Sequence, residues 1–203
     1  MNITKYLQQW SASYKADLVD NIMPFWMEHG MDYKHGGVYT CLDRDGSLID
    51  TTKSVWFQGR FGFIAAFAYN NIEKNPEWLA ASKSCIDFIE SYCFDEDGRM
   101  YFEVTENGKP LRKRRYVFSE CFAVIAMAEY ALASGDNSYV HKALELFKKI
   151  QYFITTPGIL EPKYCETVHA RGHSITMILI NTASSVRKVI NDPVLNRQID
   201  ESL

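Results

Sequence analysis

The sequence predicts an all-α protein made of stacked helix pairs, and three observations support this. Broadly apolar helical segments alternate with amphipathic ones along the 203 residues, as expected when inner helices are surrounded by protein and outer helices face water. Equivalent points at the starts of the inner helices, Trp56, Phe118 and His173, lie 62 and 55 residues apart. Short strand and turn patterns precede the first two inner helices. A repeat of this size predicts an open solenoid or a closed α/α toroid.

The N-terminal segment predicts one helix followed by a hairpin. Apolar residues recur at steps of three and four residues from about Thr4 to Pro24, the period of a helix with one buried stripe. The stripe consists of Tyr6, Leu7, Trp10, Tyr14, Leu18 and Ile22. Strand-like residues on both sides of the turn at 43–46 then predict a short β-hairpin over 36–49.

Two helix pairs and a second hairpin follow. The segment Ser54–Ile72 is apolar on most of its circumference and predicts an inner helix, whereas Pro76–Cys93 has a narrower stripe and predicts an outer one. A second hairpin is predicted over 100–111, with its turn at Asn107-Gly108. The pattern then repeats with an inner helix over Tyr116–Ser134 and an outer helix over Tyr139–Ile154.

The last part of the chain begins a third pair. An apolar helix is predicted over Gly172–Val189, and Asp192-Pro193 begins another helix that reaches the chain end. Three pairs are about half of a closed ring. We therefore expect residues 1–203 to form a single domain that corresponds to a fragment of a toroid.

The composition excludes several classes of partner. With 22 basic and 25 acidic residues and a formal charge of -3, the chain has no field that attracts nucleic acid or an anionic membrane surface. Its apolar stretches are shorter than the roughly 20 residues that span a bilayer, and its first residues lack the pattern of a signal peptide. We expect a cytoplasmic protein with no membrane or nucleic-acid partner and reduced cysteines.

Three polar residues near the starts of the inner helices are the candidates for chemistry. Arg60 lies among large apolar neighbours, so it requires either an ion pair, for which Glu120 is the obvious candidate, or an anionic or hydroxyl-rich ligand. Glu120 itself pairs with Arg60 or holds substrate hydroxyls. His173 is either a hydrogen-bonded residue at a helix start or part of a site on which all three residues converge. Trp56 and Gln58 offer a sugar an aromatic face and an amide.

Other motifs are weaker. The run from Arg112 to Arg115 is either a solvated loop or a phosphate contact at the mouth of the ring. His169 and His173 have helical spacing, but no further ligand accompanies them, so no metal site is predicted.

The ordered motifs resemble the N-acylglucosamine 2-epimerase family across the whole chain. The resemblance rests on Phe25-Trp26, on the segment 35–46, on Lys53-Ser54-Val55-Trp56-Phe57-Gln58-Gly59-Arg60, on Phe118-Ser119-Glu120 and on Gly172-His173-Ser174. Members of this family, which includes cellobiose 2-epimerases and aldose-ketose isomerases, are (α/α)6 barrels of roughly twice this length.

The resemblance implies epimerisation of a small-molecule sugar at C2, by removal and return of the proton next to the carbonyl group. Arg60 matches the arginine that binds the carbonyl or enediolate oxygen, and His173 matches a histidine at the sugar site of the isomerases. The implied substrate contacts are Tyr39, Trp56, Gln58, Glu120 and Met177. The two principal acid/base histidines of the family lie in its C-terminal half and have no counterpart here. No cofactor is implied, although ATP activates some members, and a homodimer is compatible with the resemblance.

Three other functions compete with the epimerase. An aldose-ketose isomerase uses the same toroid. A glycoside hydrolase also uses it but needs two carboxylates that face the cavity, and Glu120 is the only candidate among the inner helices. A non-enzymatic scaffold would instead bind a protein partner on its concave face.

Overall fold

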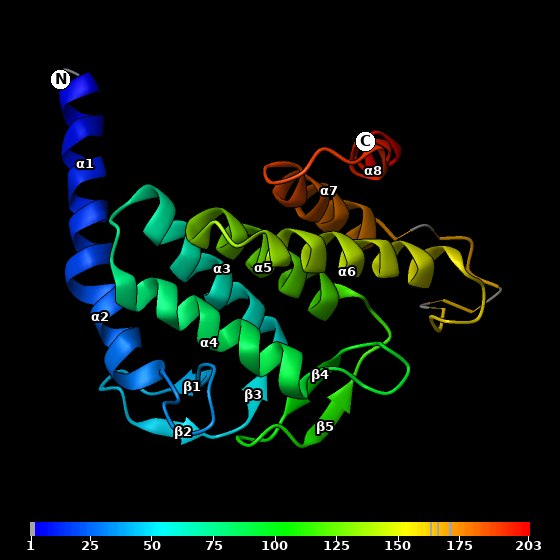
Figure 1. Cartoon of the computed structure of the whole chain (residues 1–203), viewed down its shortest axis with the longest axis horizontal. Coiled ribbons are helices and arrows are strands. Elements are labelled where there is room, and N and C mark those ends of the chain that lie inside the picture. Colours follow the sequence, from blue (N-terminus) through cyan, green and yellow to red (C-terminus); the bar gives the residue numbers. More distant parts are fainter. Residues whose placement is uncertain (1–2, 163, 166, 171) are drawn as a thin grey trace.

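The computed structural model describes residues 3–162, 164–165, 167–170 and 172–203, and it consists of helix pairs with short sheets at one end (Figure 1). The six main helices are α3 (Val55–Asn71), α4 (Pro76–Tyr92), α5 (Phe118–Ser134), α6 (Asn137–Thr155), α7 (Ser174–Arg187) and α8 (Pro193–Ser202). These bounds confirm the three predicted pairs to within a few residues. No helix in the described part of the chain is long and apolar enough to cross a membrane.

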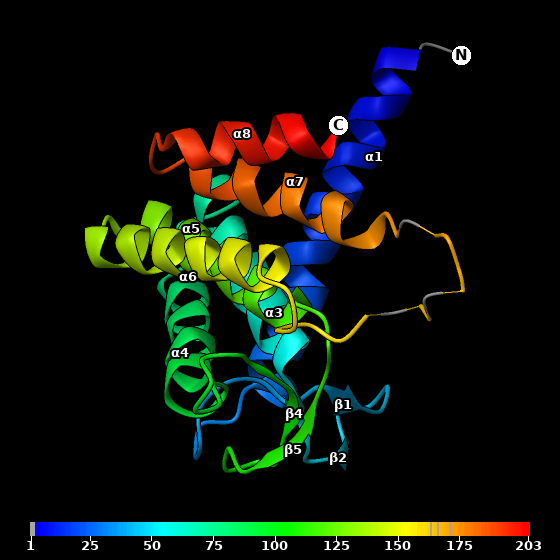
Figure 2. The ribbon, with the colours of Figure 1, turned by 90° about the vertical axis from the view of Figure 1, so that its right-hand side faces the viewer.

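The inner helices α3, α5 and α7 lie side by side, and each carries an outer helix. Helix α5 contacts α3 on one side and α7 on the other, whereas α4 packs on α3, α6 on α5 and α8 on α7 (Figures 1 and 2). This two-layer arrangement confirms the assignment of inner and outer helices that the width of each apolar face predicted.

Helix α5 forms the centre of the core because it has neighbours on nearly every side. Its alanines at 123, 126 and 128 are almost completely buried, and small side chains allow helices to approach closely. At Gly59 of α3 the two helices lie very close, because an added Cβ atom would be 2.6 Å from the carbonyl carbon of Phe122. This contact fixes the position of the N-terminal half of α3 against α5.

Two small antiparallel sheets lie at the N-terminal ends of α3 and α5 (Figure 1). The first pairs β1 (Cys41–Leu42) with β2 (Leu48–Asp50), and the second has the order β3 (Lys53–Ser54), β4 (Tyr101–Val104), β5 (Pro110–Lys113). Both hairpins agree with the prediction. The two-residue strand β3 was not predicted, and its pairing with β4 joins the entry of α3 to the second hairpin.

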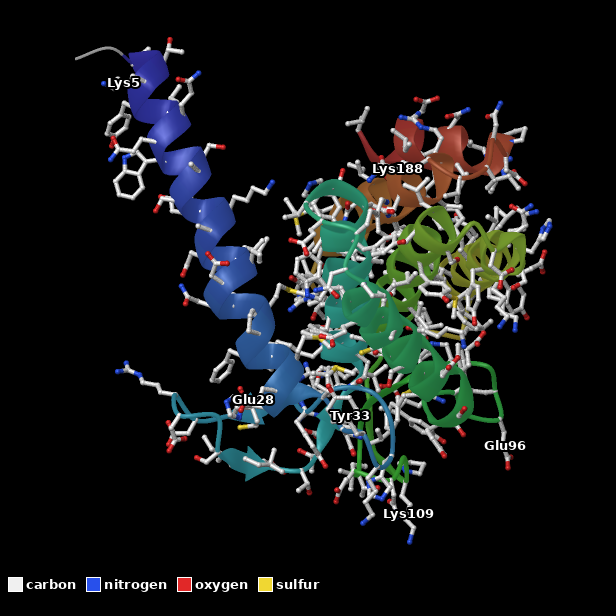
Figure 3. The ribbon with its side chains drawn as sticks, turned by 60° about the vertical axis from the view of Figure 1, so that its left-hand side comes forward. Lys5, Glu28, Tyr33, Glu96, Lys109 and Lys188 are labelled. Carbon is white, nitrogen blue, oxygen red and sulfur yellow. The ribbon has the colours of Figure 1, made fainter. Side chains whose placement is uncertain are left out.

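The N-terminal helix corrects one prediction. It comprises α1 (Ile3–Asp17) and continues through the π-helical η1 (Leu18–Ile22), the short α2 (Met23–Phe25) and the π-helical η2 (Trp26–Gly30). Its apolar stripe was expected to be buried, yet no residue of α1 is buried, and Tyr14 is 67% exposed. The reason is geometric, because α1 projects away from the helix pairs and its aromatic side chains extend into open space (Figure 3).

One side of the inner layer is also open. On α3, the side chains of Phe57, Ile64 and Phe67 are exposed, and on α7 Met177 is exposed. Inner helices of a complete ring would be covered on this side, so the fold is an incomplete toroid.

Candidate functional site

An aromatic cluster marks the end of the molecule where α3 and α5 begin. The ring of Trp56, on the first turn of α3, lies 5.4 Å from Phe118 and 5.7 Å from Phe122, which are one turn apart on α5. Phe102 of β4 completes the cluster with its ring centre 5.0 Å from that of Trp56. The cluster therefore joins both inner helices to the second hairpin, and it forms an apolar floor for the polar residues around it.

Arg60 lies one helical turn after Trp56 and on the same cluster. Its guanidinium group stands 4.3 Å from the ring centre of Phe122 and 5.8 Å from that of Trp56, distances that are typical of cation–π contacts. The side chain is exposed. Among the described residues it forms no ion pair with a carboxylate, so its charge and its planar fork of N–H donors are available to a ligand.

Glu120 has a different partner from the one considered first. Its Oε1 atom accepts hydrogen bonds from Nε of Arg99 at 2.8 Å and from the backbone N–H of Met100 at 3.0 Å. The side chain is completely buried. It therefore neither pairs with Arg60 nor reaches the surface, and it anchors β4 to α5.

Arg99 also holds the segment that precedes α5. Its Nη2 atom donates to the backbone carbonyl groups of Arg114, at 3.2 Å, and Tyr116, at 2.8 Å. The segment that connects β5 to α5 is thus held from behind by a buried ion pair. Sequence reasoning missed Arg99, because an arginine in an acidic turn at 95–99 carries no signal that its partner lies 21 residues further on.

Tyr39 and Arg60 line the same hollow. This hollow, of about 210 Å³, lies between α3 and the helical segment 18–26, and its other lining atoms are almost entirely apolar. The Tyr39 hydroxyl donates to Oε1 of Glu106 at 2.9 Å. Burial, and then the carboxylates of Glu106 and Asp32, raise the pKa of Tyr39, so this side chain remains a neutral donor. The hollow therefore offers a ligand apolar walls beside one guanidinium group.

Gln58 positions this region from inside the protein. Its side-chain amide accepts from the backbone N–H of Val38 at 2.8 Å and donates to the carbonyl oxygen of Val38 at 2.6 Å. Because the side chain is fully buried, it has no surface to present to a sugar. It instead fixes the backbone immediately before Tyr39.

A second buried ion pair lies below Tyr39. The ammonium group of Lys53 donates to Oδ2 of Asp32 at 2.7 Å and to the backbone carbonyl groups of Gly36 and Glu106 at 2.7 and 3.0 Å. Asp32, His35 and Glu106 bring potential ligand atoms within 4.8 Å of one another, as in a metal site. Here Lys53 supplies the positive charge, so this centre is an ion-pair network that ties both hairpins together.

His173 occupies the N-terminal end of the third inner helix. It is exposed, and its Nδ1 atom lies 2.9 Å from Oγ1 of Thr176 in a hydrogen bond. A neighbouring hollow of about 460 Å³ is lined by Arg115 and Tyr116 on one side and by Gly172 on the other. The starts of α5 and α7 therefore lie at the same end of the molecule.

The predicted site residues fall into three groups. Trp56, Arg60 and Tyr39 lie together around the start of α3, and Gln58 and Glu120 support them from the interior. His173 and the exposed Met177 lie on α7. Within the described part of the chain, no hydrogen bond or ion pair joins His173 to Arg60, so convergence of these two residues on one ligand stays a prediction. The fully buried Glu120 does not reach such a ligand.

Comparison with known proteins gives consistent matches along the chain. The family model of N-acylglucosamine 2-epimerase (GlcNAc 2-epimerase) matches residues 37–183. The N-acylglucosamine 2-epimerase of Rattus norvegicus is 33% identical over 181 residues, which cover 86% of this chain and 43% of the relative. The cellobiose 2-epimerase of Bacteroides fragilis is 25% identical, over 87% of this chain and 45% of that protein. The chain thus spans less than half the length of these relatives.

Solved structures show the same fold. The cellobiose 2-epimerase of Spirochaeta thermophila superimposes with a TM-score of 0.83 at 21% identity, over 100% of this chain and 54% of that structure. This likeness confirms the α/α toroid. It also shows that the chain corresponds to about half of such a toroid.

Proposed function

The chain belongs to the N-acylglucosamine 2-epimerase family, and we propose that it forms the N-terminal half of a toroidal enzyme that epimerises a sugar at C2. The observation that carries this proposal is the position of Arg60. The residue that the family resemblance assigns to the substrate oxygen stands without a carboxylate partner among the described residues, beside an aromatic floor and an open hollow. N-acylglucosamine and N-acylmannosamine, or a related pair of hexoses, are the proposed substrate and product, because the rat relative, at 33% identity, is named an N-acylglucosamine 2-epimerase.

The proposed reaction begins with the open-chain sugar. A base removes the proton from C2, the electron pair of the C–H bond forms a C1–C2 double bond, and the carbonyl electrons move to the oxygen atom, which gives an enolate, or an enediolate where C2 carries a hydroxyl group. Negative charge then develops on the oxygen atom that Arg60 would contact. A fixed guanidinium group beside aromatic rings stabilises this charge more strongly than water does. Return of a proton to the opposite face of C2 completes the inversion.

The matched residues indicate which site residues each half of the toroid would supply. This half supplies Arg60, Tyr39 and Trp56 at the start of α3 and His173 at the start of α7. Two acid/base histidines of the family belong to the half that this chain does not match. The complete reaction therefore requires both halves of the toroid, and we expect the 203 residues alone to bind the sugar without turning it over.

The hydrolase alternative loses support from the placement of Glu120. A retaining or inverting hydrolase needs two carboxylates that reach the glycosidic bond. Glu120 was the only candidate on an inner helix, and it is fully buried and bonded to Arg99. An aldose-ketose isomerase shares the enediolate and stays the second candidate.

Solvent deuterium tests the reaction type in the protein that carries both halves. Proton abstraction at C2 exchanges that hydrogen with solvent, so N-acylmannosamine formed from N-acylglucosamine in D2O should carry deuterium at C2, as seen by NMR and mass spectrometry. A hydride mechanism with a bound nicotinamide would retain the original hydrogen. Retention would contradict the proposal. With an aldose that carries a hydroxyl group at C2 as the substrate, formation of a ketose instead of the epimer would favour the isomerase.

Replacement of Arg60 tests its role in the same protein. Arg60→Ala should lower kcat by roughly 10² to 10³, by analogy with removal of one oxyanion-stabilising donor. Arg60→Lys should recover only part of this loss, because a point charge lacks the planar fork. The melting temperature should change little, since the side chain is exposed. A normal kcat together with a lower melting temperature would show that Arg60 is structural only.

A further inference from the structure

Two arginines near the proposed site have no role in the reaction described above. Arg112 on β5 and Arg114 just after it lie two residues apart and therefore on the same face of the strand. Their guanidinium groups stand 4.9 and 4.0 Å from the ring centre of Phe102. Arg114 is also 5.8 Å from the ring of Trp56, the same distance as Arg60. Three guanidinium groups thus surround one aromatic cluster.

Lys113 lies between the two arginines in the sequence and, unlike them, has carboxylate partners. Lys113 points to the other face, where its ammonium group pairs with Asp95 at 2.7 Å and Asp97 at 2.6 Å. For Arg112 and Arg114, the described part of the chain provides no carboxylate within ion-pair distance. Glu103 lies across the strand from Arg112 but forms no ion pair with it. The positive charge on the Phe102 face is therefore not balanced, although the chain as a whole carries a charge of -3.

One donor in this group is buried without an acceptor. The Nε atom of Arg114 is shielded from solvent, and no hydrogen-bond partner for it exists among the described residues. A buried N–H group without a partner is destabilising, and in a native structure it requires an explanation such as a bound water or ion. An anionic ligand would supply the missing charge, and it would also supply the acceptor if the half-buried side chain turns toward it.

The backbone that carries Arg114 is held in place before any ligand arrives. Arg99 donates hydrogen bonds to the carbonyl groups of Arg114 and Tyr116, and Glu120 fixes Arg99 in turn. The guanidinium groups of Arg112 and Arg114 also lie against the ring of Phe102. A site whose donors are already ordered loses less entropy on binding.

We propose that Arg112 and Arg114 form a subsite for an oxyanion carried by the sugar, either a phosphate ester or a carboxylate. Guanidinium groups bind both through paired N–H donors. In a hexose, a group at C6 lies at the opposite end of the carbon chain from C1 and C2, so Arg60 would meet the reacting end and the arginine pair the anionic end. This inference rests on the proposed function and narrows its substrate to an N-acylglucosamine or related hexose that carries such an anion at C6.

Calorimetric binding to the 203-residue chain tests the subsite without any turnover. The probes are N-acetylglucosamine, N-acetylglucosamine 6-phosphate and glucuronate, each titrated at low and moderate salt. We expect one of the anionic sugars to bind at least about tenfold more tightly than the neutral one, as for one well-formed charge-assisted contact. Which of the two binds more tightly identifies phosphate or carboxylate as the anion.

Variants assign the effect to the two arginines. Arg112→Gln/Arg114→Gln should reduce the preference for the anionic sugar to less than about twofold and leave the affinity for N-acetylglucosamine unchanged. The matched control Arg44→Ala/Lys109→Ala removes the same charge from exposed hairpin positions, with Lys109 near the hairpin tip (Figure 3). This control should keep the preference.

The outcomes separate this inference from the proposed function. Equal binding of neutral and anionic sugars would overturn the subsite and leave the epimerase proposal intact. Equal loss of preference in the glutamine variant and in the control would also overturn it, because only net charge would then matter. Failure of all three sugars to bind would overturn the subsite in this chain, whereas the epimerase proposal is tested separately by the deuterium experiment on the protein that carries both halves.

Discussion

Two buried ion pairs support the candidate site from behind. Lys53 and Asp32 join the loop before Tyr39 to the second hairpin, and Arg99 and Glu120 hold the segment that carries Arg114. In both pairs the charged atoms have further backbone partners, so the cost of removing them from water is offset by several hydrogen bonds. The residues proposed to meet the sugar are exposed or half-buried, whereas the residues that position them are buried.

Removal of one charge from the Lys53 pair should strongly destabilise the fold. Asp32→Asn leaves a fully buried ammonium group without its counter-ion, a change that costs about 3 to 5 kcal/mol in buried pairs. Denaturation in urea, followed by far-UV circular dichroism, measures this loss. Asp45→Asn is the matched control, because Asp45 is exposed and its side chain accepts hydrogen bonds from Ser47 in its own turn. Similar stability of both variants would contradict the assigned role of the pair.

The same carboxylate should make stability depend on acid pH. Burial opposes ionisation of Asp32, but hydrogen bonds from Lys53 and from the backbone N–H groups of His35 and Lys34 outweigh it and lower the pKa from 3.8 to about 2. A carboxyl group whose pKa is lower in the folded state stabilises the fold when it is ionised. Its contribution is complete above about pH 4 and is lost as the pH falls toward 2.

Hydrogen bonds from Lys113 and Tyr101 likewise lower the pKa of Asp95 to about 2, so part of the acid dependence comes from that half-buried group. Urea denaturation at pH 6, 4, 3 and 2 should show a steep loss of stability below pH 4 in the wild-type chain. Asp32→Asn should have a shallower dependence. Identical slopes would show that Asp32 is not ionised in the fold above pH 4.

The sequence predicted which residues could contact a ligand better than it predicted which buried residues pair with one another. Arg60 was placed at the mouth because a guanidinium group among apolar residues needs a ligand or an ion pair. The sequence could not show whether Arg60 meets a ligand or pairs with Glu120. The actual partner of Glu120 is Arg99, which comes just before the second hairpin. Pairing across tertiary space depends on how the elements pack, and one sequence does not contain that information.

Helices and their ends were predictable because local chemistry determines them. The outer helices begin at Asn75, Asp136 and Asp192, and each of these side chains accepts a hydrogen bond from a backbone N–H of the first turn. The exposed stripe of α1 was not predictable. An apolar face indicates that something covers it in a complete structure, but it does not identify the covering element. Strand β3 was missed because two residues have no periodicity.

The contact between α3 and α5 should be sensitive to one methyl group. A Cβ atom at Gly59 would lie 2.6 to 2.7 Å from atoms of Phe122, two of them in the backbone, so the helices must separate. We expect Gly59→Ala to destabilise the chain by about 1 to 3 kcal/mol, the usual cost of overpacking. Thermal or urea denaturation measures this change.

Gly62→Ala is the control on the same helix. The nearest atoms to its added Cβ, in Ala126 and Cys85, are 3.4 Å away, which is ordinary contact. Alanine also favours a helix over glycine by up to about 1 kcal/mol. This variant should therefore be neutral or more stable, and a loss equal to that of Gly59→Ala would exclude close packing at Gly59 as the cause.

The inner helices are covered by outer helices on one side of the molecule and are exposed on the other. Outer helices cover α3, α5 and α7 on one side, whereas exposed apolar residues of α1, α3 and α7 mark the other. The chain superimposes on 54% of a solved toroid. The repeat of helix pairs predicted this half ring from the sequence, because each pair is encoded locally and stacks on its neighbour.

Self-association is the expected consequence of the open side. Large apolar patches on soluble monomers are uncommon and mark interaction surfaces, and the aromatic stripe of α1 is such a surface. Light scattering should therefore give an apparent mass that rises with concentration above the 23.4 kDa of one chain. Tyr6→Ser/Trp10→Ser/Tyr14→Ser should lower this association while leaving the melting temperature nearly unchanged, since none of the three side chains is buried.

Tyr152→Ser on the outer helix α6 is the control, because it removes an aromatic side chain that is 57% exposed from the covered side. It should leave the association unchanged. If the control and the α1 variant reduced association equally, the stripe would not be the contact surface. A monomer at every concentration would show that α1 and the open inner faces are tolerated in water, and it would count against the expectation that a second half of the toroid normally covers them.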